Sequence, residues 1–162
     1  MQNYICINGN KTELTEEQLK QLGIELPKAN PFKRAGKYYT IISWGEVVCH
    51  KDGYDDFDNA CYNTGNYCTD KAILEQRALH ETLNRLLWRY SMKRNGDKLN
   101  WDDVSQGKWY IYYEIEEERF GVETIGYCYC QGEIYFYSRI DAENAIEEII
   151  KPFMAAHPEF KF

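Results

Sequence analysis

Alternation of side chains between residues 108 and 118 is the feature that most constrains the fold. The odd positions hold the more apolar set, namely Trp109, Ile111, Tyr113 and Ile115. The even positions hold the more polar set, namely Tyr110, Tyr112, Glu114 and Glu116. Successive side chains of a β-strand point to opposite faces, so the segment is predicted to be an amphipathic strand whose odd positions face a core.

A second tyrosine-rich segment, 37–43, is predicted to pair with 46–49 as a hairpin across Trp44 and Gly45. Both halves of the chain then follow one order: a hairpin, a glycine, a short aromatic strand, a Thr or Ser able to cap a helix, and an amphipathic helix. The first helix is predicted from about 70 to 93 after a Thr69 cap. The second begins after Ser138 and is interrupted by Pro152.

These elements predict the α+β class: a mostly antiparallel sheet of about five to seven strands with two main helices on one face, built from two β-hairpin-plus-helix units. Residues 1–24 are predicted to form a small strand-helix extension, in which Thr15 to Gln18 matches a capping box and Gly23 ends the helix. The segment 25–36, with two prolines, is a predicted linker, and 37–162 is the predicted main domain.

Composition and charge narrow the function classes. The chain has 26 acidic and 19 basic residues, and a net charge of −7 disfavours general nucleic-acid binding. It contains neither a run of 18 apolar residues nor a recognisable secretory signal, so a cytoplasmic protein without membrane binding is expected. A reducing cytosol predicts that the six cysteines are free thiols.

The order of aromatic residues, glycines and caps also carries a resemblance. It reads KYY…GxV…YxxGNYxT, then WxxxxQxKWYIYY…QGEIYFxS…AxxAIEEIIKPF. This order is similar to that of a widespread group of small phage and prophage proteins from Gram-positive and gut bacteria, and it spans about 37–153. The resemblance implies an accessory protein of a mobile element in a bacterial host cell, whose better-understood genomic neighbours include anti-CRISPR and other anti-defence proteins. It brings no catalytic motif.

The cysteines and histidines are the candidates for a catalytic or metal-binding motif. Cys49 and His50 are neighbours on a predicted strand and would point to opposite faces, which argues against a nucleophile-base pair. Cys128 and Cys130 would share one face of a strand, a spacing unlike the knuckle turns of structural zinc sites. No nucleophile elbow or phosphate-binding glycine loop is present. We therefore expect no enzyme activity, no cofactor and no bound metal.

The tyrosines of the predicted sheet are the main candidate site. If Ile111, Ile115 and Phe136 face the helices, four tyrosines are expected on the opposite face: Tyr110, Tyr112, Tyr135 and Tyr137. Tyr127 and Tyr129 are candidates to join them. An aromatic face with an acidic rim suits a protein partner. The predicted rim consists of Glu114, Glu116, Glu117, Asp55 and Asp56. Alternatively, these carboxylates are only solvated surface, and residues 1–36 cover the tyrosines.

The first function hypothesis is a non-enzymatic inhibitor that binds a host defence protein, with a CRISPR effector nuclease as the leading target. Acidic side chains would then imitate nucleic-acid phosphates. The second is single-stranded nucleic-acid binding, by base stacking on the tyrosines and phosphate contacts from Arg85, Arg89, Lys93 and Arg94. The third is sequestration of a signalling nucleotide in a tyrosine-lined pocket. Self-association through the tyrosine face is a further option.

Overall fold

The structure is a computed structural model that describes residues 4–7, 10–22 and 30–161, and the chain divides into two compact units, Met1–Lys33 and Arg34–Phe162. In the first unit, β1 (Tyr4–Ile7) pairs antiparallel with β2 (Asn10–Glu13), and α1 (Glu16–Gln21) follows. The predicted capping box is confirmed, because Thr15 accepts a hydrogen bond from the Gln18 N–H at 3.3 Å. The strand β2 was missed, since its sequence NKTE is polar throughout.

Two predictions for this region fall wholly or partly outside the described residues. They are the helix end at Gly23 and the first part of the linker, 25–29.

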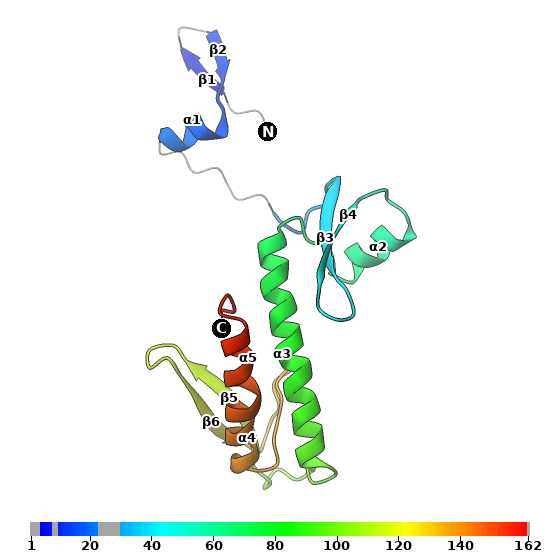
Figure 1. Cartoon of the computed structure of the whole chain (residues 1–162), viewed down its shortest axis with the longest axis vertical. Helices are drawn as coiled ribbons and strands as arrows, with labels where there is room; N and C mark the ends of the chain where they lie inside the picture. The colour runs from blue at the N-terminus through cyan, green and yellow to red at the C-terminus, as the bar shows by residue number, and fades with distance from the viewer. Residues whose placement is uncertain (1–3, 8–9, 23–29, 162) are drawn as a thin grey trace. The chain divides into compact units, whose positions relative to one another are not determined.

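The second unit contains two antiparallel hairpins (Figure 1). The first joins β3 (Lys37–Ile41) to β4 (Val47–Lys51), and the second joins β5 (Lys108–Glu114) to β6 (Arg119–Ile125). The α+β class and the antiparallel pairing are confirmed. The hairpins are separate two-stranded sheets in the described residues, so the expectation of one sheet with five to seven strands is wrong.

Each hairpin gains a short third segment and then a helix, which confirms the two hairpin-plus-helix units. Tyr39 exchanges backbone hydrogen bonds with Cys68 at 2.7 and 3.1 Å, and Trp109 does so with Phe136 at 2.9 and 2.7 Å. In both hairpin-plus-helix units, the N-cap of the helix lies two residues after the third segment, at Asp70 and at Ser138. The side chain of Asp70 accepts the N–H groups of the first turn, so the predicted Thr69 cap is displaced by one residue.

The first long helix agrees with its prediction, whereas the last one extends beyond Pro152. After the short α2 (Asp56–Asn63), α3 (Lys71–Asn95) runs as one helix and ends at Gly96 with φ +51°. The last helix does not stop at Pro152. Instead α4 (Arg139–Ala145) passes through a π-helical turn, Ile146–Ile150, into α5 (Lys151–Ala156). The wider π turn immediately precedes the proline, where its ring and missing N–H would disrupt α-helical bonding.

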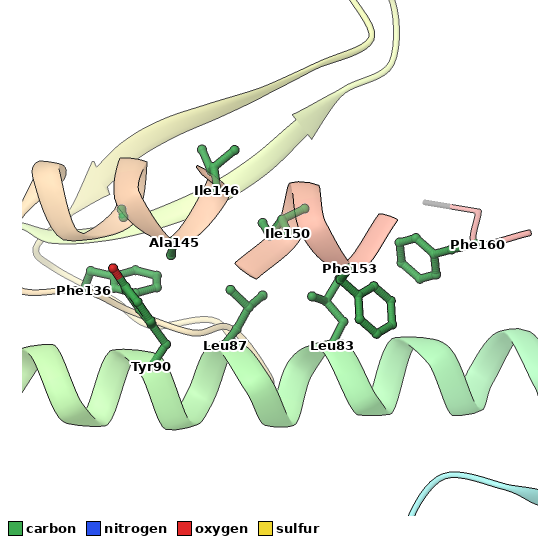
Figure 2. Close-up of a cluster of buried hydrophobic side chains, with 10 residues drawn as sticks. Leu83, Leu87, Tyr90, Phe136, Ala145, Ile146, Ile150, Phe153 and Phe160 are labelled. Atoms are coloured by element: carbon green, nitrogen blue, oxygen red, sulfur yellow. The ribbon is translucent and has the colours of Figure 1, made fainter. Parts of the chain in front are cut away.

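Helix α3 serves two separate cores, which explains why the hairpins do not merge. Its first turns pack Leu74 and Ala78 against Ile41 of the first hairpin. Further along, Leu83, Leu87 and Tyr90 face the α4–α5 segment, and Figure 2 shows them meeting Phe136, Ile146, Ile150 and Phe153. Because a 25-residue helix is about 37 Å long, each hairpin is covered at its own end.

Candidate interaction surface

The β5–β6 hairpin separates its side chains as the sequence alternation predicts, as far as the strand extends. Trp109 and Ile111 pack against the core, together with Phe120 and Val122 of the paired strand. Ile115 was predicted to join them, but it is 82% exposed. The strand ends at Glu114 and the chain turns at 115–118, so the period-two rule no longer applies to Ile115.

Tyr110 and Tyr112 lie on the opposite face of the hairpin, with ring centroids 6.5 Å apart. The Tyr110 hydroxyl donates a 3.0 Å hydrogen bond to Glu123 on the neighbouring strand, and this bond raises the pKa of Tyr110. The Tyr112 ring lies over Gly121, where a Cβ would come within 2.2 Å of its Cζ atom. Tyr112 remains 36% exposed.

Tyr135 shares this face but is not displayed, contrary to the prediction. It is 7% exposed, because Trp101 packs edge-on at 5.2 Å and Tyr110 lies 6.3 Å away. The Tyr135 hydroxyl accepts a 2.7 Å hydrogen bond from the Cys130 N–H, which closes the 126–133 loop over the ring. The covering ring comes from Trp101, a residue that the alternation analysis did not consider.

Tyr137 is 41% exposed, and its ring lies 5.6 Å from the Lys98 ammonium. Its backbone N–H donates to the Asn95 side chain at 2.8 Å, so the residue is tied to the end of α3.

Three exposed aromatic side chains lie in the loops that flank the β5–β6 hairpin in sequence. Tyr127 is 83% and Tyr129 is 73% exposed, and Trp101, at 47%, contacts Tyr129 edge-on at 5.6 Å. We call Trp101, Tyr112, Tyr127 and Tyr129 the aromatic patch. Residues 126–131 form bends, coil and the start of a turn, so the prediction that Cys128 and Cys130 share one face of a strand is wrong. The glycines at both ends of this tyrosine- and cysteine-rich run, Gly126 and Gly132, were the sequence signal that could have indicated a loop.

The segment of the chain that carries the aromatic patch is acidic. Residues 97–137 contain nine acidic and three basic residues, so most of the net charge of −7 lies in this segment. Two of the three bases are engaged. Lys108 is buried and donates to the carbonyls of Asp103 and Gln106, at 2.8 and 3.0 Å. Arg119 bonds to Glu117, and to Glu114 at 3.2 Å.

The predicted acidic rim is therefore only partly assembled. Glu116 is exposed at the hairpin turn, and Glu114 and Glu117 lie near it, both engaged with Arg119. Asp55 and Asp56 belong to the other hairpin-plus-helix unit. Asp55 caps α2 through the Asp58 N–H at 2.9 Å, and Asp56 lies in the first helical turn. Their placement fits helix capping.

Two neighbouring carboxylates, Asp52 and Asp58, are buried in a polar network. Arg34 binds both oxygens of Asp52, at 2.9 and 3.0 Å, and Tyr67 donates to Asp52 at 3.1 Å. The hydroxyl of Tyr38 donates to Asp58 at 2.5 Å, and the rings of Tyr38 and Tyr67 stack 4.1 Å apart.

This network shifts the acidity of its members. The Arg34 hydrogen bond lowers the pKa of Asp52, and the Tyr38 hydrogen bond lowers that of Asp58. Burial, followed by the bond to Asp58, raises the pKa of Tyr38. The groups satisfy one another, which is the pattern of a structural network.

The proposed nucleic-acid contacts are divided by their internal bonds. Arg85 donates to the Ser43 carbonyl at 3.3 Å, and Arg94 lies 3.5 Å from Glu148 and over the Tyr90 ring. Arg89 and Lys93 are exposed on α3. All four residues lie on this helix rather than on the tyrosine face of the hairpin.

The described cysteines are free thiols; Cys61 and Cys68 are buried, and the others are exposed, namely Cys49, Cys128 and Cys130. His50 stacks on Tyr38 at 5.3 Å, whereas Cys49 is exposed on the other side of β4. Within the described part of the chain, no three His, Cys, Asp or Glu side chains are grouped to hold a metal ion. Nor does any helix there have the length and apolar character of a membrane span.

Comparison with known proteins gave no match: no family model, no curated protein and no solved structure is significantly similar to this chain.

Proposed function

We propose that this chain is a non-enzymatic binding protein that attaches to a basic surface of a partner protein through the aromatic patch and the acidic segment that carries it. The observation that carries the proposal is the exposure of Tyr127 and Tyr129, the second of which contacts Trp101, within a segment holding most of the net negative charge. Large exposed aromatic clusters are costly to leave in water, and they are typical of binding sites.

The chemistry of the patch supports a protein partner. Tyr and Trp are enriched among the residues that dominate binding energy at protein interfaces, because they bury much surface and lose few rotatable bonds. The carboxylates of this segment would attract a positively charged partner and exclude nucleic acid.

For the partner, we propose a component of a host defence system, with a CRISPR effector nuclease first. Such effectors hold their nucleic acids in positively charged channels, which an acidic surface could enter. The acidic segment supports a basic target in general, and the choice of a defence component rests on the phage-protein resemblance of 37–153.

The test is inhibition of DNA cleavage by purified effector nucleases, with the double variant Tyr127→Ser/Tyr129→Ser beside wild type. Each lost anchor should cost more than ~1 kcal/mol of binding, so inhibitory potency should fall about tenfold or more. Trp44→Ser is the matched control, because Trp44 is 73% exposed but lies in the β3–β4 turn. It should inhibit like wild type.

Three outcomes would count against the proposal. Equal inhibition by the wild type and the double variant would remove the aromatic patch from the interface. Binding of single-stranded DNA at physiological salt would favour the nucleic-acid hypothesis. A nucleotide retained through purification would favour the sequestration hypothesis.

A further inference from the structure

A small cavity of about 240 Å³ lies beside the C-terminal core. Its apolar wall comes from Leu83 and Leu87 of α3, Ile111 of β5, and the core residues Phe136 and Ile150. Figure 2 shows four of these side chains converging between α3 and the α4–α5 segment: Leu83, Leu87, Phe136 and Ile150.

Three polar side chains join the apolar ones. His80 and Asn84 are four residues apart on α3 and therefore lie on one face of the helix. Glu133 comes from the segment opposite, directly after Gly132, whose φ of +85° turns the chain there. No lysine or arginine is among the described residues that line the cavity. His80, Asn84 and Glu133 are all exposed, so they form the solvent-facing edge of the cavity.

The charge of the described lining residues favours a cation, because Glu133 is acidic and no lysine or arginine is among them. Burial raises the pKa of the Glu133 carboxyl group, with an opposing hydrogen bond from the Ile134 N–H. A partly desolvated carboxylate gains from an ammonium group that supplies charge-assisted hydrogen bonds. An anion, such as the phosphate of a nucleotide, would instead meet a like charge and no basic partner.

The volume limits the ligand. An apolar cavity of about 150 Å³ holds benzene, and drug-sized ligands fill clefts of about 300 Å³ or more. At 240 Å³ the cavity lies between these limits. It suits one ring or short hydrocarbon chain with a small polar end.

We propose that this cavity binds a small organic cation, in which a primary ammonium group contacts Glu133 and a compact apolar body packs against Leu83 and Leu87. The apolar wall of the cavity lies on the core side of the β5–β6 hairpin, opposite the tyrosine face, and amine binding is measured independently of partner binding. The cavity also differs in chemistry from the nucleotide pocket that the sequence suggested, because its charge selects an amine.

Phenethylamine is a suitable probe, with 2-phenylethanol and 3-phenylpropionate as neutral and anionic counterparts. Ligand-detected NMR on the full chain should show phenethylamine binding more tightly than the alcohol, and no binding of the acid. Glu133→Gln should weaken phenethylamine binding about tenfold, as expected for a lost charge-assisted hydrogen bond. Glu116→Gln removes an exposed carboxylate outside the cavity and should leave the affinity unchanged.

A second variant tests the location independently of charge. Asn84→Trp places a large ring at the edge of the cavity from an exposed helix position. This variant should no longer bind phenethylamine, and its thermal unfolding temperature should stay near that of wild type. Equal affinity for the amine and the alcohol would overturn the proposal. So would an unchanged affinity in Glu133→Gln, or no detectable binding of phenethylamine.

Discussion

Replacing Ile150 and Ile115 by alanine, each in turn, tests the placement of the C-terminal core with one chemical change at two sites. Ile150 is 1% exposed in the π-helical turn, and Ile115 is 82% exposed in the β5–β6 turn. Sequence alternation assigned Ile115 to the core, so this pair separates the tertiary structure from the sequence pattern. The comparison needs only the free energies of unfolding.

The magnitude for Ile150→Ala follows from the atoms removed. Three buried methyl or methylene groups are worth about 2.5 kcal/mol in transfer free energy. The unfilled cavity adds about 1 kcal/mol, and the better helix propensity of alanine returns a few tenths. The variant should therefore lose about 3 kcal/mol of unfolding free energy. Ile115→Ala should stay within about 0.5 kcal/mol of wild type, as is usual for exposed positions.

Urea unfolding followed by far-UV circular dichroism measures both values. With a slope of about 2 kcal/mol/M, the midpoint of Ile150→Ala should fall by about 1.5 M. Equal losses for the two variants would refute the reasoning, and so would a loss below about 1 kcal/mol for Ile150→Ala.

Three further predictions concern other parts of the second unit. In the folded state the pKa values of Asp52 and Asp58 lie below the ordinary 3.8. The stability that these two carboxylates contribute is therefore present above about pH 4 and is lost as the pH falls through the folded pKa values. Asp58→Asn should make the melting temperature fall less steeply with acid than in wild type, and an unchanged slope would contradict this. Gly126→Ala should cost about 1–3 kcal/mol in urea, because its Cβ would lie 2.5 Å from the Val104 carbonyl oxygen, whereas Gly36→Ala, with no atom within 4 Å, should not. In a Cys6→Ser background, a thiol reagent should modify three cysteines of the native protein at once and the buried pair only on unfolding; the fast set is Cys49, Cys128 and Cys130.

Local signals in the sequence determined the parts of the fold that depend on near neighbours. The capping residues Thr15 and Ser138, the hairpins and the core side of Trp109 and Ile111 follow from hydrogen-bonding groups and periodicity within a few positions. The order of hairpin, short strand and helix was also readable, because each unit repeats it.

Tertiary structure alone decided which of these groups are exposed and which elements share a core. Trp101 covers Tyr135 although 34 positions separate them, and Arg34 reaches Asp52 across 18 positions, so no local pattern indicates either burial. The two hairpins remain separate because α3 offers each of them an apolar surface at a different end. Periodicity indicates which side chains share a face. Whether that face is exposed to solvent depends on residues distant in the sequence, which is why Tyr127 and Tyr129 are exposed and Tyr135 is buried.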